Sequence, residues 1–321
     1  MPPYLYLAPL RGLTDQIFRK VFSQHFHGYD MAVAPFISAV GRGRRKNSSF
    51  TDLAPENNKR LPVIPQILTK EPEEFIELAD ALSEAGHEII NWNLGCPYPM
   101  VIRKGRGAAL LPHPEKIDSF LKEVLPRIKP KVSVKMRLGL ESPEEILQVI
   151  PVLNRHPLKE VIIHARTAAQ MYKGTPHRDK FEECLALLDH TVVYNGDITS
   201  VAVFEELSQR FPQVKRWMIG RGAAIDPFLG EKIKGTCSTA DEDLMERIYN
   251  FHKGMFREYQ KTLSGHAHLL DKMKNLWSYL GENFVDGHKM MKKIKKTGSE
   301  DHYQKVVTEI FHSGMLKIEI K

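Results

Sequence analysis

Short apolar runs alternate with longer amphipathic stretches through the first 235 residues, and this alternation limits the possible folds more than any other feature of the chain. Such runs are typical of buried β-strands, and the stretches between them are typical of helices. The predicted strands cover residues 4–8, 31–34, 63–68, 89–94, 132–137, 160–164, 191–194 and 216–219. The predicted helices include 72–85, 114–128, 143–154 and 201–210, and the first three open with Pro followed by an acidic residue.

Eight βα repeats in this length predict a (β/α)₈ TIM barrel, a fold that typically needs ~250 residues. Periodicity alone also permits a doubly wound open sheet. Residues 235–243 are small and polar, and helical patterns follow at 244–260, 266–280, 287–294 and 300–313. We therefore expect an α/β chain with a TIM-barrel catalytic domain at residues 1–235 and a small all-helical domain at 245–321.

The charge of the chain permits a polyanionic partner without requiring one. Lys and Arg number 46 against 39 Asp and Glu, which gives a net charge of +7 and a pI near 9.1. From residue 251 onward there are 13 Lys and Arg against 8 Asp and Glu, so the helical part is the more basic one. A composition that is 42% hydrophobic and 26% charged excludes disorder as the dominant state.

Several classes of protein are disfavoured by what the sequence lacks. It has no run of ~18 apolar residues and does not open like a secretory signal, so we expect a cytoplasmic protein with no membrane partner. Its three cysteines, Cys96, Cys184 and Cys237, are widely spaced and odd in number. This spacing predicts neither a disulfide framework nor a metal pair, and we expect no metal.

Polar or glycine-rich residues occur at seven of the eight predicted strands, where the active site of a barrel forms. Singly, each is also typical of a core polar group, a turn or a helix cap, but their recurrence at corresponding positions favours a site. The segments are Ala8-Pro9-Leu10-Arg11-Gly12, Gln66, Asn93-Leu94-Gly95-Cys96-Pro97, Lys135-Met136-Arg137-Leu138-Gly139, His164-Ala165-Arg166-Thr167, Asn195-Gly196-Asp197 and Gly220-Arg221-Gly222.

Two of these segments indicate particular chemistry. Gly220-Arg221-Gly222 follows the last strand, where barrels commonly bind phosphate, and this position favours an anion cradle over a simple tight turn. Cys96 follows a strand directly and precedes a cationic, glycine-rich loop at residues 103–107. A thiol in that setting is a candidate nucleophile or a candidate proton donor, because an ordinary Cys is mostly protonated at neutral pH.

The order of these motifs resembles that of the tRNA-dihydrouridine synthases, over residues 4–229. Ala8 to Gly12 is similar to the A-P-M-x-G motif of that family, with Leu10 in place of Met. Asn93 to Pro97 followed by Gly107-Ala108-Ala109-Leu110-Leu111 is similar to its catalytic loop, with Arg106 where many members have Gly. The residues after 245 match no motif of the family.

The resemblance implies an FMN-binding barrel followed by a helical domain that helps to hold tRNA. It implies reduction of uridine to dihydrouridine, with hydride from FMN to C6 of uracil, protonation of C5 by Cys96, and NADPH as the reductant of FMN. The implied contacts to FMN are Pro9, Leu10, Arg11, Gln66, Lys135 and His164, and to its phosphate Asn195, Gly196, Asp197, Gly220 and Arg221.

The uridine must leave the stacked RNA to enter a barrel, which costs a few kcal/mol that phosphate contacts would offset. We expect Asn93, Arg137, Arg166 and Tyr172 to hold the uracil. The candidate phosphate contacts are Arg42, Arg44, Arg45, Lys46, Arg103, Lys104, Arg106, Lys292, Lys293, Lys295 and Lys296. We expect a monomer.

Three other functions are open at this point. The same chemistry would serve a uridine in ribosomal RNA. An FMN-barrel reductase of a small molecule, similar to dihydroorotate dehydrogenase or to an ene-reductase, would not need the basic helical part. An RNA-binding protein that has lost catalysis is disfavoured by the intact Cys96 and Lys135.

Overall fold

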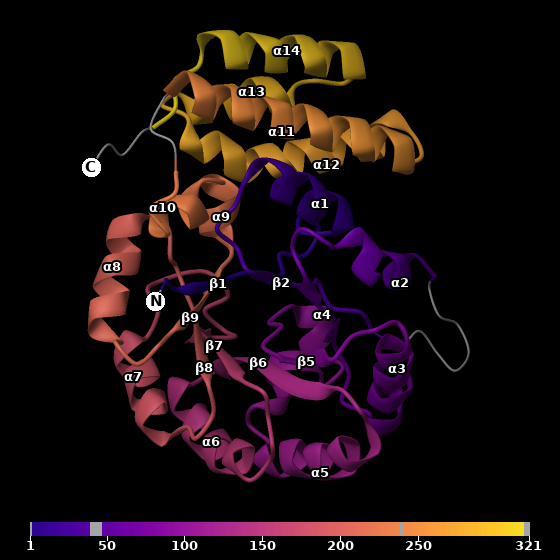
Figure 1. Cartoon of the computed structure of the whole chain (residues 1–321), viewed down its shortest axis with the longest axis vertical. Helices are drawn as coiled ribbons and strands as arrows, with labels where there is room; N and C mark the ends of the chain where they lie inside the picture. The colour runs from indigo at the N-terminus through magenta and orange to yellow at the C-terminus, as the bar shows by residue number, and fades with distance from the viewer. Residues whose placement is uncertain (1, 39–46, 238–240, 318–321) are drawn as a thin grey trace.

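The computed structural model describes residues 2–38, 47–237 and 241–317, and parallel strands form a ring in the first two of these segments (Figure 1). The order of strands around the ring is β3-β2-β1-β9-β8-β7-β6-β5-β4. Their bounds are β1 Tyr4–Leu7, β2 Met31–Val33, β3 Val63–Ile64, β4 Gln66–Ile67, β5 Ile89–Leu94, β6 Lys131–Gly139, β7 Val161–Thr167, β8 Val192–Asn195 and β9 Arg216–Ile219.

The ring closes at Pro65. Proline has no N–H to donate to a sheet, and it divides the predicted strand at 63–68 into β3 and β4. β3 pairs with β2 while β4 pairs with β5, so the same segment joins both edges of the sheet. The carbonyl of Pro65 still accepts a hydrogen bond from Asn91 N at 2.8 Å. The predicted TIM barrel is therefore confirmed, and the open doubly wound sheet is excluded.

Helices surround the strands (Figure 1). The longer ones are α1 Gln16–His25, α3 Pro72–Glu84, α5 Pro114–Val124, α6 Ile146–Asn154, α7 Arg178–Leu187 and α8 Val201–Arg210. Shorter helices lie in the loops: α2 Asn47–Leu53, α4 Pro99–Ile102, α9 Arg221–Ile225 and α10 Leu229–Ile233. The predicted helix at 143–154 begins as a 3₁₀ turn, Pro143–Glu145, where the Ser142 and Glu145 side chains form a capping box. The predicted helix at 114–128 likewise ends in a 3₁₀ turn, Leu125–Arg127.

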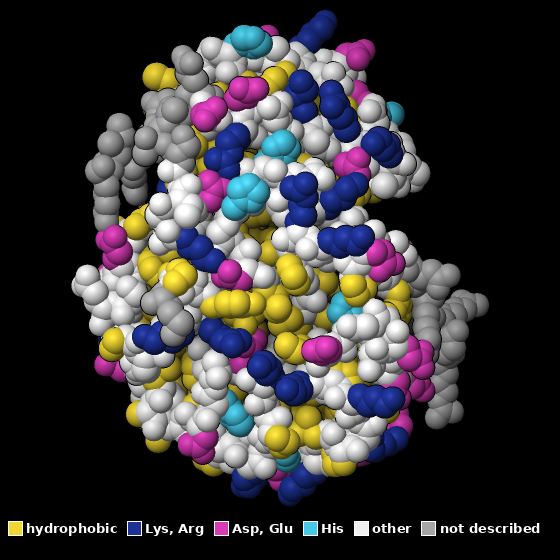
Figure 2. Space-filling view, viewed as in Figure 1, with side chains coloured by type: hydrophobic (Ala, Val, Ile, Leu, Met, Phe, Trp, Pro, Cys, Tyr) yellow, Lys and Arg dark blue, Asp and Glu magenta, His cyan; other side chains and the backbone are white. Residues whose placement is uncertain are grey.

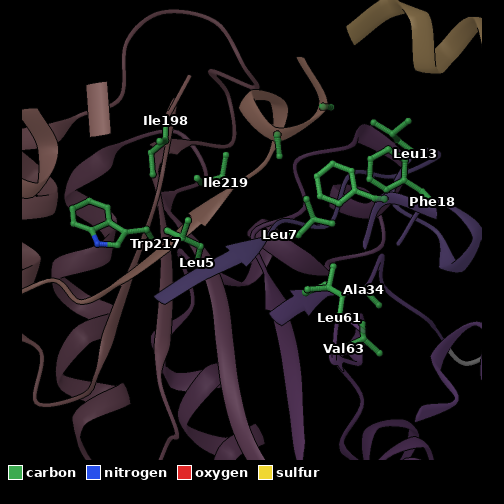
Figure 3. Close-up of a cluster of buried hydrophobic side chains, with 14 of the residues drawn as sticks. Leu5, Leu7, Leu13, Phe18, Ala34, Leu61, Val63, Ile198, Trp217 and Ile219 are labelled. Atoms are coloured by element: carbon green, nitrogen blue, oxygen red, sulfur yellow. The ribbon is translucent and has the colours of Figure 1, made fainter. Parts of the chain in front are cut away.

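Side chains alternate along each strand between the interior of the barrel and the layer under the helices. In β1, Leu5 and Leu7 belong to the helix-facing core together with Phe18 and Trp217 (Figure 3). Tyr6 lies in a separate interior cluster with apolar residues of other strands. The same parity places these polar residues inside the barrel: Asn91, Asn93, Ser133, Lys135, Arg137, His164, Arg166 and Asn195.

Four helices follow the barrel and lie together at one end of the molecule (Figure 1). They are α11 Asp241–Thr262, α12 His266–Leu280, α13 Gly287–Lys295 and α14 Glu300–Ser313, and each contains one of the predicted helices. No helix in the described part of the chain is both long and apolar enough to cross a membrane. The domain division at 235–245 stays a prediction.

Helix α11 packs directly on α1 of the barrel. The ring of Phe251 lies 5.8 Å from that of Phe18 and 5.1 Å from that of Phe26, measured between centroids. Polar contacts flank these rings, since Tyr259 donates a hydrogen bond to Oδ1 of Asp15 at 2.8 Å. The C-terminal helices therefore cover aromatic side chains that belong to the barrel core.

Candidate active site

The register of the strands brings the interior polar side chains to neighbouring positions. Asn93 pairs with Lys135, and Arg137, His164 and Asn195 occupy paired positions on β6, β7 and β8. A pocket at the carboxyl ends of the strands is lined by Lys135, His164 and Asn195 of this group, but not by Asn93 or Arg137. Its lining includes the predicted site residues Pro9, Leu10, Lys135, His164, Tyr172, Asn195, Gly196, Asp197, Gly220 and Arg221.

Lys135 places a buried amine in this pocket. Its Nζ donates a hydrogen bond to Oδ1 of Asn195 at 2.9 Å, and Nδ2 of Asn195 donates to the carbonyl of Met218 at 2.9 Å. Burial, aided by the charge of Arg137, lowers the pKa of Lys135 to about 7. The amine is therefore close to half ionised at neutral pH, and a bound anionic group would favour its charged form.

His164 is a neutral member of the same pocket. Burial, followed by the charges of Arg137, Lys135, Arg166 and Arg221, lowers its pKa well below the ordinary value. Its Nε2 lies 3.4 Å from Nη1 of Arg166, which can only donate there. His164 therefore contributes hydrogen-bonding capacity at neutral pH and no charge.

Cys96 lies in a loop that is fixed by hydrogen bonds to Asn93 and by close packing of Gly107. Oδ1 of Asn93 accepts hydrogen bonds from Gly95 N at 3.0 Å and from Cys96 N at 2.9 Å. Gly107 packs against Cys96 with a φ of +62°, and a Cβ at Gly107 would lie 2.9 Å from the Cys96 carbonyl oxygen. Both the conformation and the close approach therefore require glycine at this position.

The thiol of Cys96 is held in its protonated form. Burial raises its pKa, although the Tyr98 backbone and the charges of Arg11, Arg137 and Lys135 act in the opposite direction. A thiolate nucleophile would need a lowered pKa. Of the two roles that the sequence permitted, the environment of Cys96 favours proton donation.

A chain of buried side-chain amides supports this loop from below. Nδ2 of Asn93 donates to Oε1 of Gln66, and Nε2 of Gln66 donates to Oδ1 of Asn91, both at 2.7 Å. Nδ2 of Asn91 in turn donates to Oγ of Ser133 at 2.8 Å. Asn91 and Ser133 were not among the predicted site residues. Their positions, two residues before Asn93 and Lys135 on the same strands, were the signal that could have identified them.

Asp197 is shared by two arginines. Its Oδ1 accepts from Nη1 of Arg166 at 2.9 Å and from Nη2 of Arg221 at 2.6 Å. Burial raises the pKa of Asp197, but the hydrogen bonds and charges of both arginines outweigh it, so the pKa is lowered. The three groups carry a net charge of +1. Arg166 is only 1% exposed and is not part of the pocket lining; it holds Asp197 and also donates to the carbonyls of Lys173 and Gly174.

Arg137 and Tyr172 meet at the rim of the pocket. Nη1 of Arg137 donates to the carbonyls of Thr167 and Met171, both at 2.7 Å, and its guanidinium carbon lies 5.4 Å from the centroid of the Tyr172 ring. Tyr172 is 40% exposed. These contacts order the loop after β7 over the pocket.

The candidate phosphate contacts have different surroundings. Arg42, Arg44, Arg45 and Lys46 lie outside the described residues. Nη2 of Arg106 lies 3.3 Å from Oε2 of Glu74, so Arg106 ties the loop that follows Cys96 to α3. Lys292, Lys293, Lys295 and Lys296 are exposed on or beside α13. Figure 2 shows Lys and Arg side chains on both the helical part and the barrel, around apolar side chains near the centre of this face.

The family of the chain follows from comparison with known proteins. A family model described as "Dihydrouridine synthase (Dus)" matches residues 6–313. The chain belongs to the dihydrouridine synthase family. The match includes the four C-terminal helices up to the last residue of α14, and it confirms the resemblance found in the strand-end motifs.

Relatives of this dihydrouridine synthase are similar over most of their length. The tRNA-dihydrouridine(16) synthase of Pseudomonas putida is 32% identical over 272 residues, which cover 80% of this chain and 82% of that protein. The protein of the same name from Cupriavidus necator is 28% identical, with 87% and 90% covered. The tRNA-dihydrouridine synthase B of Pasteurella multocida is 28% identical, with 70% and 67% covered.

Solved structures with low sequence identity share the barrel fold of the dihydrouridine synthase. An old yellow enzyme homologue from Zymomonas mobilis has a TM-score of 0.52 at 11% identity, covering 75% of this chain and 91% of that one. A DHODH from Eimeria tenella has a TM-score of 0.51 at 11% identity, with 78% and 84% covered.

Among the described residues, no group of three or more His, Cys, Asp or Glu is placed to hold a metal ion.

Proposed function

We propose that the chain reduces uridine in tRNA to 5,6-dihydrouridine, with FMN as its cofactor and NADPH as the reductant. The protonated thiol of Cys96 beside the pocket of Lys135 and His164 carries the proposal, because reduction of a C=C bond needs a proton donor as well as a hydride donor. Relatives named as tRNA-dihydrouridine synthases support tRNA as the substrate. Position 16 is the first to examine, since both of these names specify it.

The residues of the pocket fit FMN. Lys135, neutral His164 and Asn195 offer donors suited to the carbonyl groups of a flavin ring. Near Arg221, a Cβ at Gly222 would lie 2.0 Å from the Ile198 carbonyl oxygen, so the chain passes there closely enough to require glycine. The net positive charge of Arg166, Asp197 and Arg221 suits a phosphate group.

FMN, when bound and reduced, would supply the hydride to C6 of uracil. The ammonium of Lys135 would stabilise the negative charge of the reduced flavin ring, an interaction that is strong because the amine is buried. The thiol of Cys96 would donate its proton to C5 and recover one from solvent. Asn93 would hold the Cys96 backbone through its two accepted hydrogen bonds.

The uracil would enter the site on the side of Arg137 and Tyr172. Three hydrogen bonds to backbone carbonyls hold the Arg137 guanidinium in place before any ligand binds. Such prior ordering lowers the entropy cost of binding a flat substrate. We also propose that the protein acts as a monomer in the cytoplasm.

Mass-spectrometric mapping of dihydrouridine in tRNA and rRNA tests this function, using cells with and without the gene. We expect one or more tRNA positions to lose the modification, and the wild-type gene to restore it. The Cys96→Ala protein should bind FMN and accept electrons from NADPH but fail to restore it. Loss of dihydrouridine from rRNA alone would show that the substrate is rRNA and not tRNA. No loss anywhere, from a protein that still binds flavin, would favour a small-molecule reductase.

A further inference from the structure

Arg11 is an exposed arginine at the rim of the site with aromatic rings as its partners. Its guanidinium carbon lies 5.8 Å from the centroid of the Phe36 ring and 5.6 Å from that of the Tyr98 ring. It forms no ion pair with a carboxylate in the described part of the chain. The resemblance placed Arg11 at the flavin, yet Arg11 is not part of the pocket lining.

The two rings that flank Arg11 belong to the immediate surroundings of the thiol. Phe36 packs against a small cluster of Leu68, Cys96 and Val101. Tyr98 comes two residues after Cys96 and directly precedes α4. Tyr98 is 36% exposed and Met100, on the same turn, is 66% exposed. The Arg11–Tyr98 pair therefore presents flat and apolar surface to solvent next to the reacting thiol.

A second aromatic–guanidinium group contains Tyr172, a residue of the pocket lining. The ring of Tyr172 contacts the guanidinium groups of both Arg137 and Arg221, with 5.1 Å between the Arg221 guanidinium carbon and the ring centroid. Helix α12 contributes the half-buried Tyr279, whose pKa is raised by burial first and then by the nearby Tyr98. Asn275 of the same helix donates to the Gly12 carbonyl at 3.3 Å, directly after Arg11.

We propose that the Arg11–Tyr98 pair binds the nucleobase next to the target uridine by stacking. The proposal rests on the proposed function, since it requires an RNA substrate. Extruding a uridine breaks its stacking with both neighbours and leaves their faces exposed. Aromatic rings and guanidinium planes are the side chains on which unstacked bases bind, without strong dependence on which base it is. The pair would thus recover part of the cost of extrusion at the place where that cost arises.

The experiment compares Tyr98→Ala with the matched control Tyr98→Phe, which keeps the ring. The full-length flavin-bound proteins are titrated with the unmodified tRNA whose modified position the mapping has identified. We expect Tyr98→Ala to weaken binding roughly 5- to 150-fold, the range for loss of one stacked base, and Tyr98→Phe to stay within about twofold. The slope of log affinity against log salt should not change, because no phosphate contact is lost.

Abasic RNA identifies the partner of the pair. Two tRNAs are prepared, one abasic at the nucleotide before the target uridine and one abasic at the nucleotide after it. We expect one of the two to bind the wild-type protein more weakly than intact tRNA does. Tyr98→Ala should bind that tRNA about as well as it binds the intact one, because both changes remove the same contact. If Tyr98→Ala does not fold, the affinities of the wild-type protein for the abasic and intact tRNAs still test whether a neighbouring base stacks on the protein.

The outcomes separate this inference from the proposed function. A wild type that forms no dihydrouridine would contradict the function itself. An active wild type that binds both abasic tRNAs as tightly as intact tRNA would overturn the stacking role. So would a Tyr98→Ala protein that binds intact tRNA within twofold of the wild type, or one whose loss of affinity comes with a shallower salt slope.

Discussion

Nζ of Lys135 donates a hydrogen bond to Oδ1 of Asn195 at 2.9 Å, and so links β6 to β8 across the intervening strand β7. Ile162 is the register partner of Lys135 on β7, and its apolar side chain offers the amine no hydrogen-bond acceptor. The amine is consequently buried with one amide oxygen as its partner. This arrangement holds a potential positive charge in the pocket at a cost to stability.

Lys135→Met should therefore stabilise the protein without flavin. In the flavin-bound protein, the same change should abolish most of the activity. Lysine has a pKa of ~10.4 in an unfolded chain but about 7 at this position. Between these pH values the unfolded chain binds more protons than the folded chain, so the free energy of unfolding rises with pH. The buried ammonium therefore lowers stability fully below pH 7 and not at all above ~10.4. We expect Lys135→Met to raise Tm at pH 6 by about 1–2 °C per kcal/mol recovered, and less at pH 9.

Thermal unfolding at the two pH values measures this effect, with Lys289→Met as the control because Lys289 is exposed. The loss of turnover should be about 10²- to 10³-fold, as for other preorganised electrostatic groups. An equal gain in Tm at both pH values, or a gain in the control, would contradict the shifted pKa of Lys135.

Alkylation of Cys96 by iodoacetamide should reach half its maximal rate at a higher pH than alkylation of an unstructured cysteine peptide, whose pKa is about 8.5. Burial raises the pKa of this thiol, and the thiolate is the species that reacts. Mass spectrometry of the peptide containing Cys96, sampled over time at several pH values, gives the rate. A midpoint below that of the peptide would indicate a stabilised thiolate and would favour a nucleophile over a proton donor.

Ser133→Ala should destabilise the protein through the buried amide chain. The change leaves Nδ2 of Asn91 without its partner at a position that is 0% exposed. An unsatisfied buried donor costs about 1–3 kcal/mol. Urea unfolding should show a lower midpoint than for Ser208→Ala, a control in which an exposed hydroxyl bonded to the Glu205 carbonyl is removed. Equal midpoints for the two variants would show that the amide chain contributes little.

Phe251→Ala should destabilise the barrel as well as the helices that follow it. The Phe251 side chain is 1% exposed and contacts the rings of Phe18 in α1 and of Phe26 directly after it, so its removal should cost about 3–5 kcal/mol. Because these rings belong to the core under the barrel helices, one cooperative transition should shift as a whole. Calorimetry measures it, with the exposed Val285→Ala as the control. A separate early transition that leaves the barrel unaffected would contradict the shared core.

Much of the fold was determined by local patterns in the sequence. The alternation Val132, Ser133, Val134, Lys135, Met136, Arg137 has a period of two, which is the geometry of a strand with one apolar and one polar face. This period by itself places Lys135 and Arg137 on the same side of the strand, whichever strands it pairs with. The helices at 266–280 and 300–313 were predicted with the bounds of α12 and α14, because caps and helical periodicity are also local.

Contacts between distant segments depended on the tertiary structure. Closure of the barrel at Pro65, the sharing of Asp197 by Arg166 and Arg221, and the direction of Arg11 toward Phe36 and Tyr98 all involve residues on different strands or loops. Periodicity specifies the face of a strand to which a side chain belongs. It does not specify the register between strands or the path of a loop, and these set which side chains meet.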